Sequence, residues 1–286
     1  MKPIISARRA ALDNCYALPL HRRVMARIAI TGSCGLIGGL VFDTLSQHGH
    51  EVVGIDRPHE DRISRGRNVD DEGAYSRLTH SCDLAQTSEE DLTKWFADCQ
   101  VVIHLAADAD PSNRDLSMLE TNICSTHNVL KAAAAANVGR VILASSGLTQ
   151  VTLERRLDND ISMIGVEHGV GIDTPYGLTK IIGEQLGKRF AKKHGLEVVS
   201  VRIGTVVPDD SEHFKRGGRL MATAFLSEDV KNFFLSTLTA NLDSCNGHLI
   251  TAAQSDSPTR FIDLEPGVSI LGWKPIEWPR AEVNEE

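Results

Sequence analysis

The sequence predicts an α/β protein built on a doubly wound parallel sheet with a small C-terminal lobe. The first observation is the stretch from Arg27 to Gly39, where a short apolar run breaks into glycines at three-residue spacing and continues as a helical pattern. The second is that further apolar runs of strand length alternate with helical stretches along the chain. The third is the length of 286 residues, which fits one large α/β domain with or without a small additional lobe.

The composition separates the first residues from the rest of the chain. Residues 1–27 carry six basic residues and one acidic residue, whereas the whole chain has a formal net charge of −8. We therefore expect residues 1–26 to be a disordered extension, with Met25 as an alternative start, and the acidic remainder to have no nucleic-acid partner. Residues 27–204 are expected to form a dinucleotide-binding domain. Residues 205–286 are expected to form a small substrate-binding lobe of the same compact unit.

Membrane, metal and disulfide signals are absent from the sequence. No apolar run approaches the roughly 20 residues needed to cross a bilayer. The six cysteines are scattered without a CxxC pair or a Cys/His cluster, which favours reduced thiols and no metal site. We therefore expect a soluble cytoplasmic protein with no membrane partner.

The glycine turn after the first predicted strand is a candidate phosphate-binding loop. The start of a helix offers unpaired backbone N–H groups and a positive dipole end to a pyrophosphate. Glycines permit the tight turn, the close approach of a ligand and the close packing of helix on strand. A glycine turn without a ligand is the alternative, and the motifs that follow count against it. The expected cofactor contacts here are Gly32, Cys34, Gly35, Leu36, Ile37 and Gly38.

The second predicted strand, Glu51 to Asp56, ends in a carboxylate 24 residues after Gly32. A dinucleotide fold places there the acid that accepts hydrogen bonds from the adenosine ribose, and its charge repels a 2′-phosphate. This favours NAD over NADP, although the neighbouring Arg57 is able to pair with such a phosphate. A third strand is expected over residues 78–84, after a loop over 59–73. Asp83 at its end contacts the adenine or is an ordinary loop carboxylate, and both interpretations stand.

Two further predicted strands deliver candidate site residues to the same edge of the sheet. The apolar run 101–107 passes through Leu105 and ends in the small residues Ala106 and Ala107, which leave room for a cofactor. His104 within this run is expected to be a hydrogen-bonded core residue. A helix follows over 117–136, in which Asn122 is expected to have a specific partner because its helix propensity is poor. The strand 141–144 then presents Ser145 and Ser146 at the carboxyl edge, where ligands bind in open α/β sheets.

Thirty residues after Ser146, the segment Tyr176-Gly177-Leu178-Thr179-Lys180 opens a helix that runs to His194. Tyrosine and lysine four residues apart share one helical face. A nearby ammonium stabilises a phenolate, which allows a tyrosine to act as a base near neutral pH. The candidate catalytic residues are therefore Tyr176, Lys180 and Ser146, the last of which would hydrogen-bond the reacting oxygen.

These motifs together resemble the extended short-chain dehydrogenase/reductases, the NAD-dependent epimerase/dehydratase group. The residues that carry the resemblance are Thr31 to Gly38 (TGSCGLIG), Asp56, Asn122, Ser145-Ser146 and Tyr176 to Lys180 (YGLTK), and it spans about Arg27 to Pro279. The resemblance implies a Rossmann fold, NAD as cofactor, and a homodimer or higher homo-oligomer. It further implies cofactor contacts from Leu84, Asn122, Tyr176, Lys180 and Ile203.

Within this group the chain is most similar to bacterial uronate dehydrogenases. The similarity lies in Arg202 to Thr205 (RIGT), Arg219 to Met221 and Phe225 to Asp229 (FLSED). It implies that the anomeric carbon of a hexuronic acid is oxidised to an aldarolactone, with Arg219 gripping the carboxylate. Ser146, Gly147 and Thr205 are the other implied substrate contacts. The chain departs from those enzymes in having Gly147-Leu148 after the serine, in place of Asn-His, and a longer interval before the tyrosine.

Other interpretations of the site remain open. A nucleotide-sugar epimerase or dehydratase, or a sugar-phosphate dehydrogenase, would use Arg219 to hold phosphate, but the 82 residues after Gly204 favour a small free sugar or sugar acid. They are expected to contain a helix over 227–239 and a strand over 247–252. A non-catalytic dinucleotide sensor would have no need of Tyr176 and Lys180. Arg219 itself is alternatively a surface arginine beside Lys215 and Arg216, after a flexible loop over 208–218.

Overall fold

The structure is a computed structural model that describes residues 25–58, 72–110, 117–157, 160–209, 211, 218–276 and 278. Most of the predicted extension over 1–26 therefore lies outside the described residues. The same is true of most of the predicted loops over 59–73 and 208–218, including Lys215 and Arg216.

A seven-stranded parallel sheet forms the centre of the protein, in the order β3-β2-β1-β4-β5-β6-β7. This confirms the predicted doubly wound sheet, because the chain builds outward from β1 in one direction and then from β4 in the other. Strand β7, which comes from the C-terminal part, pairs directly with β6 in the same sheet. The strands are β1 (Arg27–Thr31), β2 (Glu51–Asp56), β3 (His80–Ser81), β4 (Val101–His104), β5 (Arg140–Ser146), β6 (Glu197–Ile203) and β7 (His248–Ala253).

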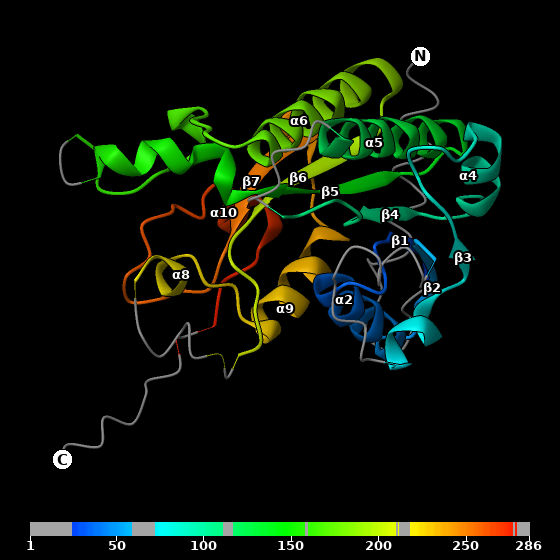
Figure 1. The fold of residues 1–286 in the computed structure, drawn as a ribbon, viewed down its shortest axis with the longest axis horizontal. Coiled ribbons are helices and arrows are strands. Elements are labelled where there is room, and N and C mark those ends of the chain that lie inside the picture. Colours follow the sequence, from blue (N-terminus) through cyan, green and yellow to red (C-terminus); the bar gives the residue numbers. More distant parts are fainter. Residues whose placement is uncertain are drawn as a thin grey trace.

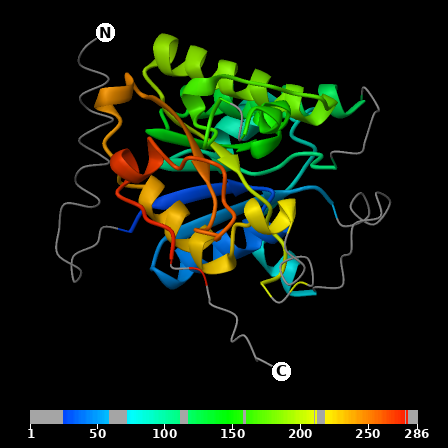
Figure 2. The same cartoon turned by 90° about the vertical axis from the view of Figure 1, so that its left-hand side faces the viewer.

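Helices cover both faces of the sheet (Figure 1). One face carries α4 (Glu89–Trp95), α5 (Ser117–Ala135) and α6 (Pro175–His194), which contact one another in that order. The opposite face carries α2 (Leu36–Gln47) and α9 (Ser227–Thr237). Figure 2 shows the same layers from the side. The shorter elements are α8 (Arg219–Ala222), α10 (Gly267–Leu271), η2 (Glu72–Arg77), η3 (Gly147–Arg156), η4 (Val166–His168) and η5 (Asp243–Cys245).

Each face of the sheet has its own apolar core. Strand residues alternate between the two, so that Ile28 and Ile30 face α2 and α9 while Ala29 faces the α4–α6 layer. All four residues of β4 are buried, as expected for a central parallel strand covered on both sides. The apolar residues from which the strands were predicted are therefore the same residues whose side chains pack the helices against the sheet.

Helix boundaries follow from local capping chemistry. Ser88 accepts a hydrogen bond from the Asp91 N–H and thereby caps the start of α4. The helix that carries Tyr176 starts in the same way, because the Thr174 hydroxyl accepts from the Gly177 N–H and Pro175 occupies the first helical position. Gly195 ends this helix with a φ of 64°. These caps set where α6 begins and ends.

The predicted third strand is too long. Only His80 and Ser81 pair with β2, because the chain turns at Asp83. The Asp83 carboxylate accepts from the Ala85 N–H at 2.9 Å, and its backbone carbonyl accepts from Gln86 and Thr87. The predicted strand over 101–107 likewise ends earlier, at His104, and the residues after it border a cavity.

In the described part of the chain, no helix is long and apolar enough to cross a membrane. Across the same residues, no cluster of three or more His, Cys, Asp or Glu side chains has the geometry to hold a metal ion.

Candidate active site

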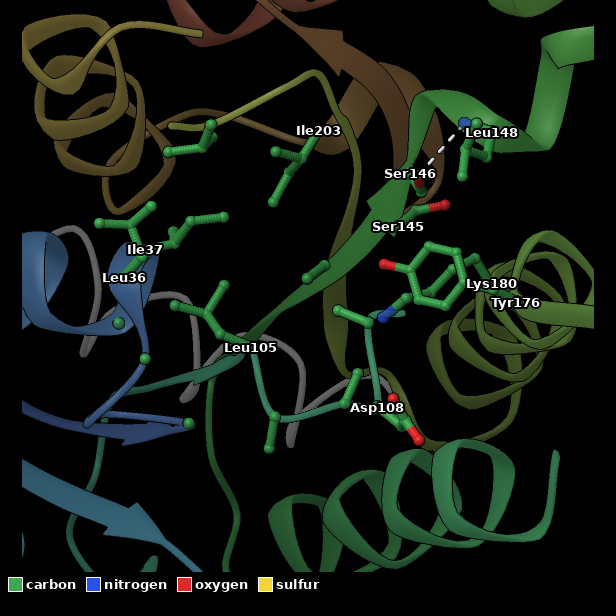
Figure 3. A pocket seen from close by; sticks show the side chains of 18 of the residues that line it. Leu36, Ile37, Leu105, Asp108, Ser145, Ser146, Leu148, Tyr176, Lys180 and Ile203 are labelled. Atoms are coloured by element: carbon green, nitrogen blue, oxygen red, sulfur yellow. Dashed lines mark hydrogen bonds between the residues drawn. The ribbon is translucent and has the colours of Figure 1, made fainter. Parts of the chain in front are cut away.

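A cavity of about 660 Å³ opens at the carboxyl ends of the strands. It spans the point where the strand order reverses, between β1 and β4, which is the usual ligand site of an open α/β sheet. Figure 3 shows that side chains reach it from the start of α2, from the ends of β5 and β6, and from α6. Predicted site residues that line it are Gly32, Gly35, Leu36, Ile37, Gly38, Asp56, Asp83, Leu84, Leu105, Ala106, Ala107, Ser146, Gly147, Tyr176, Lys180, Ile203, Thr205 and Arg219.

The glycine loop packs too tightly for side chains. Gly32 has a φ of 77°, and a Cβ there would lie 2.7 Å from the Ala106 nitrogen. A Cβ on Gly38 would lie only 2.0 Å from the Gly32 carbonyl oxygen. These two glycines therefore allow α2 to begin directly beneath the cavity. Cys34, which was predicted to contact the cofactor, is buried and does not line the cavity. Its backbone N–H donates to Asp56 Oδ2 at 2.9 Å.

The carboxylate at the end of β2 is held by the backbone. Asp56 Oδ2 accepts from Cys34, and its Oδ1 accepts from the Arg57 N–H at 2.7 Å. The Arg57 guanidinium lies 3.3 Å from Asp83. Asp83, which the sequence left open as an adenine contact or a loop carboxylate, therefore serves as the ion-pair partner of Arg57 while bordering the cavity.

Tyr176, Lys180 and Ser146 lie on one side of the cavity (Figure 3). Lys180 Nζ is 5.3 Å from the centre of the Tyr176 ring. Ser146 Oγ accepts from the Leu148 N–H at 3.2 Å. Because that bond uses an acceptor site, the Ser146 hydroxyl can still donate its proton to a ligand. Serine, phenol and ammonium thus converge where a reacting hydroxyl would sit.

Lys180 is buried, and the described residues provide no counter-ion for it. Within the described part of the chain its ammonium has no hydrogen-bond acceptor, and burial lowers the pKa of Lys180 to about 8. An ammonium in such a position is costly unless a ligand supplies oxygen atoms. The ribose hydroxyls of a dinucleotide would meet this need. Together with the glycine loop and Asp56, the residues present fit NAD.

Two polar residues behind the cavity have structural partners. Asn122 does not line the cavity: its side chain accepts from the Asp108 N–H at 2.8 Å, and donates to the Asp108 carbonyl at 2.9 Å and to Thr179 Oγ1 at 3.3 Å. It therefore joins α5, the segment after β4, and α6. His104 hydrogen-bonds Thr31 and Thr126 through its two ring nitrogens. Burial lowers the pKa of His104 to about 3, so the imidazole is a neutral core group.

A buried ion pair fixes the strand ends next to the catalytic candidates. Glu184 of α6 accepts from Ser145 Oγ at 2.6 Å and pairs with both Arg202 Nε and Nη2, at 2.9 and 3.0 Å. All three side chains are buried. Because a buried carboxylate with every partner satisfied holds its neighbours in one arrangement, the bonds set α6 against β5 and β6.

The substrate side of the cavity differs from the sequence-based expectation in one respect. Arg219 lines the cavity, but its guanidinium is paired with Glu154, with Nη2 2.7 Å from Oε1 and Nε 3.0 Å from both carboxylate oxygens. Glu154 lies in η3, within the long interval between serine and tyrosine. The carboxylate facing Arg219 thus comes from the protein itself.

Sequence reasoning did not identify several cavity residues. Glu154 gave no signal, because its role depends on a contact with a residue 65 positions away. Gln254 directly follows β7, and the rule that ligands lie at carboxyl strand ends would have pointed to it. Thr223 hydrogen-bonds Thr205 at 2.8 Å and donates to the Arg219 carbonyl. Its only proton is thus used, so Thr205 is the donor in their bond and is left with acceptor capacity.

Fold and cavity together define a dinucleotide-dependent enzyme of the α/β class. The model of the NAD dependent epimerase/dehydratase family matches residues 28–229. The chain therefore belongs to this family, and it is an NAD-dependent enzyme of the extended short-chain dehydrogenase/reductase type, as the sequence motifs predicted.

Individual relatives agree with this assignment. The chain is 31% identical over 265 residues to an L-arabinose 1-dehydrogenase (NAD(P)(+)) of Haloferax volcanii, covering 88% of this chain and 96% of that one. It is 26% identical over 200 residues to a uronate dehydrogenase of Agrobacterium fabrum, covering 68% and 67%. A mutant uronate dehydrogenase of Agrobacterium tumefaciens, solved with NAD, has a similar fold, with a TM-score of 0.68 at 23% identity over 89% of this chain and 86% of that one.

Proposed function

We propose that the protein oxidises a small free sugar or sugar acid at its anomeric hydroxyl carbon with NAD. The observation that carries the proposal is the convergence of Ser146, Tyr176 and Lys180 beside a cavity whose glycine loop fits a dinucleotide. NAD, when bound, accepts the hydride that leaves the carbon. The anomeric C–H bond breaks, the hydroxyl loses its proton, and a carbonyl group forms, which in a ring sugar is a lactone.

The protein residues act on the proton and on position. Tyr176 takes the hydroxyl proton as the hydride leaves. Lys180 favours the phenolate through its charge and holds the ribose. Ser146 donates its free proton to the reacting oxygen and keeps that oxygen next to Tyr176.

A hexuronic acid is the first substrate candidate, converted to its aldarolactone. The guanidinium of Arg219 lies at the cavity, and its planar fork matches a carboxylate through two parallel hydrogen bonds. With the carboxylate held there, the anomeric hydroxyl would be directed towards Tyr176. This candidate requires Glu154 to give up its bonds to Arg219.

A neutral aldose is the second candidate, and the ion pair favours it. In the structure Glu154 already occupies the guanidinium of Arg219. A substrate carboxylate would replace the Glu154 carboxylate there, so Arg219 would gain no additional hydrogen bonds. A neutral sugar can instead meet the pair through hydroxyl groups, which donate to Glu154 and accept from Arg219. The similarity to an L-arabinose 1-dehydrogenase supports the same choice.

The first test is to measure NADH formation with aldoses, uronic acids and sugar phosphates. Oxidation of an aldose or a uronic acid is expected. If only a sugar phosphate is oxidised, the free-sugar proposal is wrong. If no sugar is oxidised but a nucleotide-sugar is converted, the chain is an epimerase or dehydratase of the same family.

The two candidates are separated by two substitutions. Glu154→Gln frees the Arg219 fork, so kcat/KM for uronic acids is expected to rise by about 10-fold, the worth of a charge-assisted hydrogen bond. If Arg219 already binds a uronic acid in the unchanged protein, Arg219→Met will lower kcat/KM for that acid and spare its parent aldose. Equal effects of Arg219→Met on the uronic acid and on its parent aldose would show that Arg219 does not bind the substrate carboxylate. The matched control is Glu167→Gln, because Glu167 is an exposed carboxylate that also lies between Ser146 and Tyr176 in the sequence.

A further inference from the structure

Gln254 carries a buried side-chain amide in the wall of the cavity, and its Oε1 has no hydrogen-bond partner among the described residues. Its side chain is 1% exposed and lines the cavity. Within the described residues neither amide atom forms a hydrogen bond, and Oε1 is fully covered. Buried side-chain amides are nearly always bonded in native proteins. An unbonded one at a ligand cavity therefore calls for a ligand group that completes it.

The backbone around Gln254 is held firmly on both sides. The Ala253 carbonyl accepts from the Gly204 N–H at 3.0 Å, and the Ser255 N–H donates to Ala224 at 2.8 Å. The Ser255 hydroxyl donates to the buried carboxylate of Asp229 and accepts from the Leu226 N–H. The position of the Gln254 backbone is consequently set by the sheet and by the start of α9.

Strand register places this amide on a line with the catalytic candidates. Ser146 pairs with Ile203, and Ile203 pairs with Ala253, so the next residues on the three strands are Gly147, Gly204 and Gln254. Neighbouring strands are about 4.8 Å apart, so the backbones of Gly147 and Gln254 are separated by roughly 10 Å. A sugar ring lying over this row and reacting beside Ser146 would carry its far hydroxyls towards Gln254.

Gly204 leaves the space that the glutamine side chain occupies. A Cβ on Gly204 would lie 2.7 Å from Gln254 Cγ and 3.3 Å from its Cδ. The side chain of Gln254 therefore leans across Gly204 towards the Ser146 side of the cavity. Gly204 also leaves room for the Thr223 carbonyl oxygen, which would lie 2.3 Å from the same Cβ.

We propose that Gln254 is a specificity-determining residue whose amide hydrogen-bonds a hydroxyl group of the sugar ring remote from the reacting carbon. The assignment rests on the proposed function, and it names a contact for a neutral part of the substrate. Because Oε1 is covered, the amide would meet a substrate hydroxyl through Nε2 as a donor, or through Oε1 as an acceptor after a half-turn of the amide group. A sugar epimer or deoxy sugar that does not present this hydroxyl leaves the amide unpaired and is discriminated against.

The test combines Gln254→Met with sugars that lack one hydroxyl at a time. The best substrate of the unchanged protein is expected to lose about 10-fold in kcat/KM with the variant, the worth of one lost hydrogen bond. The deoxy analogue that lacks the hydroxyl bound by Gln254 should be a poor substrate for the unchanged protein. Its kcat/KM should be no lower with the Gln254→Met variant than with the unchanged protein. NAD affinity, measured by calorimetry, should be the same in both proteins.

Gln150→Met is the matched control for stability. Gln150 is equally buried, but its amide donates to the carbonyls of Gly165 and Gly169 at 2.8 and 3.0 Å. The midpoint of thermal unfolding is expected to fall in Gln150→Met and not in Gln254→Met, because only the former breaks existing bonds.

Either of two kinetic results would overturn the assignment while leaving the proposed function intact: unchanged kcat/KM in Gln254→Met for every sugar, or a loss of the same size for every deoxy analogue. A fall in the unfolding midpoint as large as that of Gln150→Met would also overturn it, because the amide would then have structural partners. If the unchanged protein oxidises no sugar, the proposed function fails, and this assignment fails with it.

Discussion

Replacing Lys180 with methionine is expected to stabilise the protein while removing its activity. The methionine side chain has a similar length and no charge, so it fits the same buried position. Burial lowers the pKa of Lys180 from 10.5 to about 8, and each pKa unit corresponds to about 1.4 kcal/mol. Removing the buried charge should therefore raise the free energy of unfolding at pH 7 by on the order of 3 kcal/mol.

The pH dependence of this gain has a definite sign. Below pH 8 both the folded and the unfolded protein carry the Lys180 proton, so the full cost of the buried charge is present. Between pH 8 and 10.5 the folded protein releases the proton first, so the unchanged protein gains stability relative to the variant as the pH rises. The difference in unfolding free energy should therefore shrink towards zero near pH 10.5.

Urea unfolding of both proteins at a series of pH values measures this difference, and NADH formation measures activity. Lys188→Met is the matched control, because Lys188 is an exposed lysine of the same helix and surface substitutions usually change stability by less than about 0.5 kcal/mol. A Lys180→Met protein that is no more stable at pH 7, or whose advantage does not diminish at high pH, would refute the reasoning.

Three further predictions concern the mechanism, the cofactor and the response to acid. Tyr176→Phe should lower turnover by about 100-fold or more with NAD binding intact by calorimetry, and near-normal turnover would remove the tyrosine from the mechanism. NAD should bind more tightly than NADP because Asp56 repels a 2′-phosphate. Asp83→Asn should reduce this difference in affinity, because it releases Arg57 to pair with the phosphate. An unchanged difference in affinity would contradict a role for the Arg57–Asp83 ion pair. Burial lowers the pKa of His104 in the folded protein to about 3, so below pH 6.5 the unfolded chain binds a proton at this residue and the folded chain does not. The free energy of unfolding, measured with urea, should therefore fall by about 1.4 kcal/mol per pH unit below pH 6.5 through His104 alone. His248, whose pKa is lowered to about 4, adds to the same trend, and a flat profile between pH 6.5 and 5 would exclude a neutral buried His104.

The parallel sheet and the cofactor side of the cavity were accessible from the sequence because their signals are local. The glycine spacing from Gly32 to Gly38 reports a turn, and the apolar run of β4 reports a strand buried on both faces. Asp56 and Ser146 follow from a single rule, that ligand-binding residues stand at the carboxyl ends of parallel strands. None of these inferences requires knowledge of which distant segments touch.

The substrate side was less accessible because it depends on long-range contacts. Arg219 was expected to face a substrate carboxylate, and no local pattern indicated that Glu154 would occupy its fork. Asn122 was expected to have a partner, but only the folded chain identifies that partner as the backbone of Asp108. Strand ends are uncertain for the same reason: the carboxylate of Asp83 turns the chain where apolar periodicity alone would extend β3.

The origin of the cavity walls bears on how such a protein diverges. The NAD side is built from β1, β2, β4 and α6, whose residues also form the two apolar cores. The proposed sugar side is lined by residues of η3, of α8 and of the segment after β7. Mutations in separated sites usually combine additively, so residues such as Glu154 and Gln254 can change without disturbing cofactor binding. After gene duplication, a copy would be free to acquire a new sugar through a few such exchanges while retaining its redox chemistry.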